Sequence, residues 1–327
     1  MSAVLVTGGL GAIGSWVTRE LVEQGKRAVS YDARLDTTLV KDIEDKLECV
    51  VGDVLDLPSI IHTIKHYEVE RIIHMAAALP DLCEANPLVG FRINVEGTLN
   101  VFEAARLMDI RRVVYASSRS VYDISRGEYA HPTYKPIDED YPKAPRDVYG
   151  ATKLFAEHMG ANYNRIYGLD VIGLRFAYTY GPGKQARGGT RAIYSRLVEN
   201  AMLKEPLEIP QGGDRVDDLI YNGDIARGIV LACFAENPEH RIFHLGTGKG
   251  ITLRDMLEVL NRIVGEVPIK IGPGLDFPGY VSRRNFVYNI DRARKELGFS
   301  PQYDLEKGVR SYIETMTRLG ISPVLLP

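Results

Sequence analysis

Residues Ala3 to Gly14 read Ala-Val-Leu-Val-Thr-Gly-Gly-Leu-Gly-Ala-Ile-Gly, and an amphipathic segment, Ser15 to Gln24, follows them directly. An apolar run, a glycine turn and a helix in this order predict a dinucleotide-binding unit. In such a unit Gly8 permits the tight turn, Gly11 lets the backbone approach a pyrophosphate, and Gly14 lets the helix pack against the strand. The helix N-terminus then faces the phosphates.

Asp32 ends the second apolar run, Arg27 to Tyr31. A carboxylate about twenty residues past the glycines accepts hydrogen bonds from both adenosine ribose hydroxyls and repels a 2′-phosphate. The sequence therefore predicts NAD rather than NADP. Two alternatives stay open, because Asp32 can simply begin a turn and Arg34, two residues on, can admit a 2′-phosphate.

The composition narrows the class of protein. The chain has 327 residues, enough for one large α/β domain or two smaller ones, and a net charge of −3. This balance gives no sign of a nucleic-acid partner or a membrane surface. No apolar stretch approaches the ~20 residues of a membrane span and no signal segment is visible, so we expect a soluble, cytoplasmic protein. The spacing of Cys49, Cys83 and Cys233 and of the dispersed histidines predicts no metal site and no disulfide.

Short apolar runs alternate with helical segments along the chain. This alternation predicts an α/β fold with a doubly wound parallel sheet of the Rossmann type, covered by helices on both faces. The runs are Val4–Val6, Arg27–Tyr31, Leu47–Val51, Arg71–Met75, Arg112–Ala116, Asp170–Leu174 and Arg241–Leu245. Because parallel strands all end at one edge of the sheet, that edge is where ligands are expected to bind.

Two regions rich in Gly and Pro interrupt the alternation, Gly181–Gly213 and Gly248–Phe299, and a helical segment, Leu305–Leu319, follows the second. The strand pattern returns between them, which predicts a smaller, discontinuous lobe over the ligand edge. We assign residues 1–175 and 215–247 to an NAD-binding domain, and residues 176–214 and 248–327 to a substrate-binding lobe.

The pattern Tyr-x-x-x-Lys occurs three times, at Tyr149 with Lys153, Tyr180 with Lys184, and Tyr303 with Lys307. Gly-Pro-Gly after Tyr180 excludes a helix for the second pair, and the third lies far along the chain in the expected lobe. Tyr149 begins a strongly helical segment, so that it shares one helix face with Lys153. The first pair is therefore the candidate for chemistry.

The strand that precedes this helix ends in the hydroxyl-rich run Ser117-Ser118-Arg119-Ser120, at the same sheet edge. A lysine charge and a positive nicotinamide ring both favour the phenolate of Tyr149, whose ordinary pKa is about 10. A depression of roughly three units would make Tyr149 a general base near neutral pH. Ser118 would hold the substrate hydroxyl and share its proton.

At this point the chain resembles the extended short-chain dehydrogenases/reductases, in the NAD-dependent epimerase/dehydratase family, over nearly its whole length. The motifs that carry the resemblance are Thr7–Gly14, Gly52–Val54, His74–Ala78, Asn94–Thr98, Ser117–Tyr122, Tyr149 with Lys153, and Leu174–Phe176 through Tyr180–Gly183. The resemblance implies that Asp53 reaches the adenine, that Ser118 is the catalytic hydroxyl, and that Ser117 lies nearer the cofactor.

These arguments together give three sets of expected site residues. The catalytic set is Ser118, Tyr149 and Lys153. The NAD-binding set is Gly8, Gly11, Ala12, Ile13, Gly14, Asp32, Asp53, Val54, Ala76, Ala77, Ala78, Asn94, Ser117, Tyr149, Lys153 and Phe176. The substrate-binding set is Ser118, Arg119, Ser120, Tyr178 and Arg187.

The chain departs from its family pattern in ways that bear on the substrate. Members that dehydrate sugars carry Asp-Glu after the catalytic hydroxyl, where this chain has Arg119 and Ser120, so we do not expect dehydratase activity. Nucleotide-sugar enzymes of the family usually carry Asn where this chain has Tyr178, and Arg where it has Asp217. An aspartate that faces a diphosphate repels it unless a neighbour such as Arg215 or an ion relieves the charge.

The loop Leu79 to Pro87 also looks short. These departures together favour a smaller substrate, such as a free sugar, a sugar acid or another polyol derivative. Several arginines are candidates for a carboxylate or phosphate clamp, although each can equally form a solvated or structural ion pair. They are Arg92, Arg175, Arg187, Arg191, Arg283 and Arg284.

Three functions remain open at this stage. A sugar epimerase retains NAD and returns the hydride to the other face of the ketone, whereas a dehydrogenase releases the ketone and NADH. The third is a non-catalytic NAD-binding regulator, which does not need its catalytic groups, although this chain keeps them. By resemblance we also expect a homodimer, formed by the helix of Tyr149 and the segment Val95–Met108. Ala104, Ala105, Ala151 and Ala156 would allow that contact, or would equally suit burial against the sheet.

Overall fold

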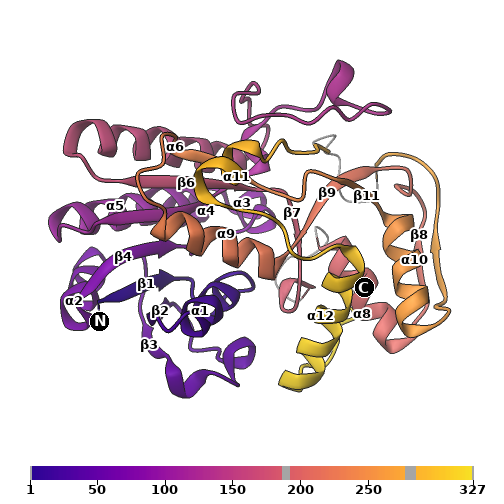
Figure 1. The fold of residues 1–327 in the computed structure, drawn as a ribbon, viewed down its shortest axis with the longest axis horizontal. Coiled ribbons are helices and arrows are strands. Elements are labelled where there is room, and N and C mark those ends of the chain that lie inside the picture. The colour runs from indigo at the N-terminus through magenta and orange to yellow at the C-terminus, as the bar shows by residue number, and fades with distance from the viewer. Residues whose placement is uncertain (1, 186–191, 277–284, 326–327) are drawn as a thin grey trace.

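The computed structural model describes residues 2–185, 192–276 and 285–325 (Figure 1). Its central sheet has seven strands in the spatial order β10-β6-β5-β4-β1-β2-β3, and every neighbouring pair is parallel. The strands are β1 (Ala3–Thr7), β2 (Arg27–Asp32), β3 (Glu48–Val51), β4 (Val69–His74), β5 (Arg112–Ser118), β6 (Val171–Phe176) and β10 (Ile242–Leu245). Each of the seven expected runs overlaps one of them, so the predicted doubly wound sheet is confirmed. Its strand order reverses between β1 and β4, which is where ligands bind in such sheets.

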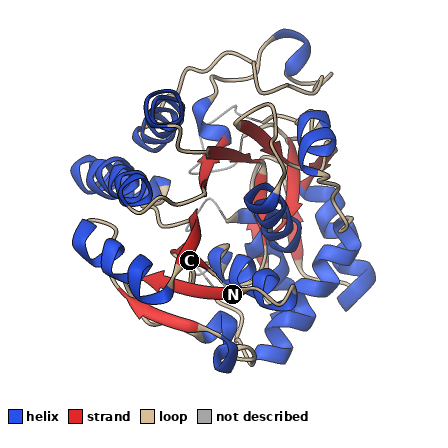
Figure 2. Cartoon of the chain, turned by 60° about the vertical axis from the view of Figure 1, so that its left-hand side comes forward, coloured by secondary structure: helices blue, strands red, loops and turns tan. Residues whose placement is uncertain are grey.

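Helices cover both faces of this sheet (Figures 1 and 2). They are α1 (Gly14–Glu23), α2 (Leu57–Tyr67), α5 (Gly97–Leu107), α6 (Val148–Tyr167), α9 (Asn222–Phe234) and α11 (Asp291–Leu297). The short helices α3 (Pro80–Ala85) and α4 (Pro87–Phe91) pack against α6 instead of the sheet. Successive strand residues point to opposite faces. Val4 and Val114 accordingly pack in one core with α1, α9 and α11, whereas Leu5 and Val113 pack in the other with α2, α5 and α6.

A second group of elements forms a smaller unit, on the right in Figure 1. A three-stranded sheet has the order β11-β9-β7, and a two-stranded sheet pairs β12 with β8. The elements are β7 (Tyr178–Tyr180), β8 (Leu207–Ile209), β9 (Val216–Tyr221), β11 (Gly250–Thr252), β12 (Ile269–Ile271), α8 (Ile193–Leu203), α10 (Leu253–Val264) and α12 (Leu305–Leu319). They share their own apolar core. The exact division of the chain into two domains stays a prediction.

The structure differs from the sequence prediction in two segments. β9 was missed because Asp217 and Asp218 interrupt its apolar pattern, although both carboxylates are buried. The expected loop Leu79–Pro87 is mostly α3, which begins at Pro80, and α4 begins at Pro87. Proline in the first turn of a helix loses no hydrogen bond, so these prolines start helices rather than prevent them. In the part of the chain that the structure describes, no helix combines the length and the apolar character needed to cross a membrane.

Candidate active site

Gly8 and Gly14 are among the positions of the turn between β1 and α1 where only glycine fits. Gly8 has a φ of +65°, and a Cβ on it would lie 2.7 Å from the amide nitrogen of Ala76. A Cβ on Gly14 would lie 2.0 Å from the carbonyl oxygen of Gly8. Any side chain at either position would push the turn away from the ends of β1 and β4, because neither neighbour is a flexible side chain. Gly11 closes the turn, since its amide donates to the Gly8 carbonyl over 3.0 Å.

The N-terminus of α1 suits an anion. Ile13 occupies the N-cap position without a side-chain hydrogen bond, and the first turn carries no acidic residue. The main-chain N–H groups and the positive end of the helix dipole are therefore not neutralised by a cap. Asn222, at the start of α9, holds the turn from the other side, because its Nδ2 donates to the Ala12 carbonyl over 3.0 Å. Sequence reasoning missed Asn222, since it follows the strand β9 that was itself missed.

Asp32 and Asp53 lie at the carboxyl ends of β2 and just after β3. The Asp32 carboxylate accepts hydrogen bonds from the amides of Leu10, at 3.2 Å, and Arg34, at 3.4 Å, which fixes it beside the glycine turn. Asp53 begins a short turn in which its Oδ1 accepts from the Leu55 amide over 2.9 Å. Amides at a helix N-terminus and a carboxylate at the end of the second strand are the donor and acceptor set that a dinucleotide needs, so these residues fit NAD.

The segment after β4 is held by Asn94. Its amide group bonds the main chain of Ala78 twice, with Oδ1 accepting at 2.7 Å and Nδ2 donating at 3.0 Å. Its Nδ2 also reaches the hydroxyl of Thr152 on α6 over 3.2 Å. Asn94 lies in one π-helical turn, Arg92–Glu96, a distortion that is frequent at functional sites. Asn94 thereby connects the Ala76–Ala78 segment to the helix that carries Tyr149.

His74 supports the same edge in its neutral form. Its Nδ1 lies 2.7 Å from the Thr7 hydroxyl, and its Nε2 lies 3.1 Å from the Thr98 hydroxyl. Because Thr98 donates its own proton to the Asn94 carbonyl over 2.6 Å, its oxygen must accept from His74, which assigns the proton to Nε2. Burial and the nearby Lys153 ammonium lower the pKa of His74 to about 3. His74 is therefore a neutral link between β1 and α5.

Tyr149 and Lys153 lie on the first two turns of α6. Asp147 starts this helix, since its Oδ1 accepts from the Gly150 amide over 2.6 Å. The Lys153 Nζ lies 5.5 Å from the centre of the Tyr149 ring. Tyr149 is half-buried, whereas Lys153 is only 4% exposed. Burial lowers the pKa of Lys153 to about 8, and Cys83 opposes this shift.

Gly150 brings this helix against the serine run after β5. A Cβ on Gly150 would lie 2.2 Å from the carbonyl oxygen of Ser120, so only glycine permits the contact. Ser118 ends β5, and its Oγ accepts from the Ser120 amide over 3.0 Å. The structure thus brings the Ser118–Ser120 turn and the first turn of α6 together. Neither the spacing nor the composition of the sequence revealed the role of Gly150.

Ser117 points to a different side from Ser118. Its hydroxyl donates to Glu157 on α6 over 2.5 Å. Glu157 also accepts two hydrogen bonds from Arg175, from Nε at 2.8 Å and from Nη2 at 2.6 Å. The guanidinium of Arg175 is 2% exposed and is committed to this pair. Arg175 is therefore a structural residue and not part of an anion clamp.

The other arginines of the expected clamp fall into two groups. Arg92 forms an exposed ion pair with Glu96 at 3.3 Å, so it is a solvated ion pair and not part of an anion clamp. Arg187, Arg191, Arg283 and Arg284 lie outside the described residues. The remaining expected site residues lie near the same strand ends: Ile13, Val54, Ala77 and Phe176 flank the ends of β1, β3, β4 and β6.

Asp217 is not an isolated negative charge. Arg215 bonds it twice, at 2.8 Å and 3.1 Å, and Arg119 bonds it at 3.0 Å, with both arginines and the aspartate buried. These arginines hold the pKa of Asp217 below its usual range against the opposing effect of burial. The guanidinium of Arg119 also lies 5.0 Å from the centre of the Tyr178 ring. Of the two alternatives that the sequence left open for Asp217, the structure therefore shows the one in which neighbours, Arg215 and Arg119, relieve its charge.

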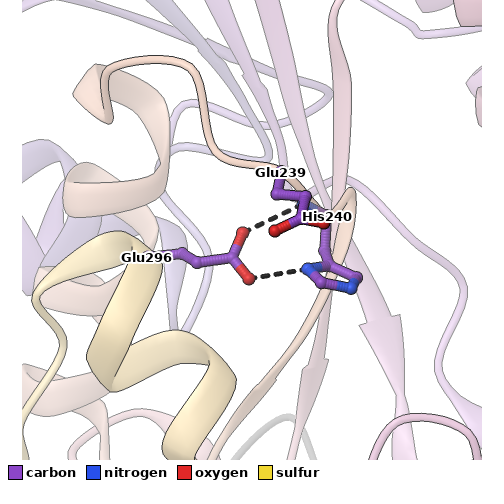
Figure 3. Close-up of side chains that lie close together, drawn as sticks. All are labelled: Glu239, His240 and Glu296. Carbon is purple, nitrogen blue, oxygen red and sulfur yellow. Dashed lines mark hydrogen bonds and ion pairs between the residues drawn. The ribbon is translucent and has the colours of Figure 1, made fainter.

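One group of possible metal ligands occurs among the described residues: Glu239, His240 and Glu296 offer ligand atoms that all lie within 4.8 Å of one another (Figure 3). Glu296 uses both of its oxygens on His240, accepting from the main-chain amide at 2.9 Å and facing Nδ1 at 2.6 Å. These bonds attach α11 to the segment before β10. The group has a structural explanation and contains none of the candidate catalytic residues.

Comparisons with known proteins agree with this architecture. The sequence profile of the NAD dependent epimerase/dehydratase family matches residues 4–246. A Methanocaldococcus jannaschii protein named "Putative UDP-glucose 4-epimerase" is 31% identical over 318 residues, covering 96% of this chain and 98% of its own. The UDP-glucuronate 4-epimerase of Thermodesulfobacterium geofontis is 26% identical over 321 residues, covering 95% and 94%.

Among solved structures, the UDP-glucose 4-epimerase of Thermus thermophilus, a complex with NAD, superposes with a TM-score of 0.81 at 26% identity. The match covers 96% of this chain and 99% of that one. The family profile thus covers most of the chain. The chain belongs to the NAD-dependent epimerase/dehydratase family.

Proposed function

We propose that this protein is an enzyme that epimerises a sugar by transient oxidation of one secondary alcohol, with NAD as a retained cofactor. The glycine turn and Asp32 would hold NAD, which would supply the reversible hydride acceptor that this oxidation needs. One observation carries the proposal: Gly150 packs the Tyr149 turn of α6 against the Ser118–Ser120 turn, at the carboxyl end of β5. This contact sets the turn that carries Ser118 beside the helix turn that carries Tyr149, at the sheet edge where dinucleotides bind.

Each of the three residues has a distinct task in this proposal. Tyr149 takes the proton of the substrate hydroxyl and gives it back after the ketone has turned. Ser118 holds the reacting oxygen and shares that proton. Lys153 supplies the positive charge that stabilises the Tyr149 phenolate, an effect that burial strengthens because the local dielectric is low. Arg119 and Ser120 stand where dehydratases carry an acid pair, so we propose no dehydration.

We propose a nucleotide sugar as the substrate. Two observations support this substrate. The relatives above are named for UDP-glucose and UDP-glucuronate. Asp217, whose charge argued against a diphosphate, is paired with two arginines. Incubation of the purified protein with NAD and a panel of sugars, sugar acids and nucleotide sugars tests this. An inverted product without net NADH supports an epimerase. Stoichiometric NADH means a dehydrogenase, and no reaction with any member of the panel contradicts the proposal.

Asp32 is expected to select NAD over NADP. The Asp32→Ala substitution removes the carboxylate that would bond the ribose hydroxyls, and we expect the affinity ratio of NAD to NADP to fall by about 10- to 100-fold. Titration calorimetry with both nucleotides measures the ratio. Asp45→Ala is the matched control, because Asp45 is an exposed acid in the segment that follows β2. An unchanged ratio in the Asp32 variant would eliminate the ribose role.

Lys153 gives the activity a predictable pH dependence. With its pKa lowered to about 8 by burial, the ammonium loses its proton as the pH rises through that value, and the support for the Tyr149 phenolate disappears. We expect kcat/KM to fall on this alkaline side. Lys153→Arg keeps the positive charge at all accessible pH values, so the pH profile of kcat/KM for this variant should lack the alkaline fall. Lys143→Arg, at an exposed position, is the control and should show the same alkaline fall as the parent. If kcat/KM of the Lys153→Arg variant falls at the same alkaline pH as that of the parent, Lys153 does not stabilise the Tyr149 phenolate.

We also propose a homodimer, in which α4, α5 and α6 pack against a second copy. Ala104, Ala105 and Ala156 do not support it, because they are buried in the core under α5 and α6. The support comes instead from exposed apolar side chains on these helices. They are Leu88, Phe91, Leu107, Phe155, Ile166 and Tyr167. Light scattering that gives the mass of one chain would contradict the dimer.

A further inference from the structure

The segment that follows β7, Gly181 to Gln185, lies against the dinucleotide-binding turn. A Cβ on Gly181 would lie 2.5 Å from Nδ2 of Asn222, and the same nitrogen donates to the Ala12 carbonyl of the turn over 3.0 Å. One side chain therefore separates this segment from the N-terminus of α1. That N-terminus has no side-chain cap and no acidic residue in its first turn, so it suits the phosphates of a dinucleotide.

Two further contacts fix the segment on either side of Lys184. A Cβ on Gly183 would lie 2.6 Å from Cδ1 of Leu39, in the part of the chain that follows β2. Gln185 is fully buried, and its Nε2 donates to the Val324 carbonyl over 3.4 Å. Lys184 thus extends from a segment that its neighbours hold beside the turn where the cofactor phosphates are expected.

Lys184 is the lysine of the second Tyr-x-x-x-Lys pair, and it is partly exposed. Within the described residues, no hydrogen bond or ion pair involves its Nζ. Burial lowers the pKa of Lys184 to about 8, and no neighbouring charge contributes to this shift. The ammonium is therefore charged at neutral pH in a place where the surrounding groups solvate it poorly, and an anion would relieve this cost.

Two carboxylates on the elements that contact this segment are bonded elsewhere. Asp42, in the part of the chain after β2, accepts from both Nη atoms of Arg19, at 2.9 and 2.6 Å. Asp224, in the first turn of α9, accepts from two main-chain amides, at 2.8 and 3.0 Å. Neither carboxylate shifts the pKa of Lys184. The described part of the chain thus supplies no counter-ion for Lys184 and leaves its charge to a ligand.

We propose that Lys184 is a cofactor-binding residue whose ammonium pairs with the pyrophosphate of NAD. Two independent features point to this ligand: the uncapped N-terminus of α1 suits a phosphate, and the segment packed beside it carries an ammonium without a partner. A lysine side chain reaches roughly 6 Å from its Cα, which is enough to pass one intervening side chain. A charge-assisted bond of this kind slows the dissociation of NAD. The inference needs NAD as the cofactor but not the proposed epimerisation.

The experiment measures how fast bound NAD exchanges with radiolabelled NAD on the NAD-loaded protein, without any sugar. Lys184→Met keeps the aliphatic length of the side chain and removes its charge. Because burial disfavours that charge, the fold should survive the change, and circular dichroism checks this. Lys184→Arg keeps a cation at this partly exposed position. Lys46→Met is the matched control, because Lys46 is an exposed lysine between β2 and β3.

We expect Lys184→Met to accelerate the exchange of NAD by about 10- to 100-fold, whereas Lys184→Arg and Lys46→Met should stay within about threefold of the parent. Exchange in Lys184→Met that is as slow as in the parent overturns the inference. Equally fast exchange in both Lys184 variants also overturns it, because the effect would then not follow the charge.

A second measurement separates NAD from the diphosphate of a nucleotide sugar, which is another source of paired phosphates. Titration calorimetry of the NAD-loaded protein with UDP should give the same result for the parent and for Lys184→Met. Weaker binding of UDP to the variant, with NAD exchange unchanged, would assign Lys184 to the substrate and overturn the inference. Because neither measurement needs turnover, both stay valid if the epimerase assay fails.

Discussion

The Tyr149→Phe variant should lose catalytic turnover by about 10²- to 10⁴-fold, which is the range expected when a general acid-base group is removed. The substitution deletes a single oxygen from a half-buried ring. It leaves the Asp147 cap, the contact of Gly150 with Ser120 and the glycine turn intact. We therefore expect the NAD affinity and the urea midpoint to stay close to those of the parent, while kcat for the epimerised sugar collapses.

Tyr303→Phe is a matched control for this experiment. Tyr303 has the same spacing to a lysine, and the Lys307 Nζ lies 5.0 Å from its ring centre, a geometry similar to that of Tyr149 and Lys153. Tyr303 nevertheless lies just before α12, where it contacts Tyr221, and not at the carboxyl edge of the central sheet. Removal of the Tyr303 hydroxyl should therefore leave kcat within about twofold of that of the parent. Full activity of Tyr149→Phe would refute the assignment of the base.

The Glu157→Gln variant should lose about 3 to 5 kcal/mol of unfolding free energy, the largest effect on stability that we expect from a single polar substitution. Glu157 accepts both hydrogen bonds of a buried bidentate pair with Arg175 and one from Ser117. Glutamine keeps the shape but not the charge, so Arg175 is left as a buried cation. Urea unfolding followed by circular dichroism measures the change.

Two further variants decide whether the orphaned charge is the cause. Removal of both charges, as in Glu157→Leu with Arg175→Met, should recover most of the loss, since buried ion pairs gain little over apolar packing. Glu96→Gln is the matched surface control, because Arg92 and Glu96 are 56% and 46% exposed, and we expect it to change the unfolding free energy by less than about 1 kcal/mol. A loss of similar size for Glu96→Gln and Glu157→Gln would contradict the explanation.

The sequence alone determined the large-scale fold of the central sheet. All seven of its strands were expected, because buried parallel strands are continuous apolar runs whose pattern needs no tertiary information. The position of Tyr149 and Lys153 on one helix face was also determined locally, by helical spacing. The choice among the three Tyr-x-x-x-Lys pairs was possible since glycine and proline exclude a helix after Tyr180.

Only the tertiary structure decided what the charged residues do. The sequence left open whether a neighbour relieves the charge of Asp217, and folding places Arg119, from 98 residues earlier in the chain, on its carboxylate. The sequence made Arg175 a candidate for an anion clamp, yet in the structure its guanidinium forms a buried ion pair with Glu157. The physical reason is that secondary structure follows from patterns of neighbouring residues, whereas the effect of a charge depends on which distant groups surround it once water is excluded.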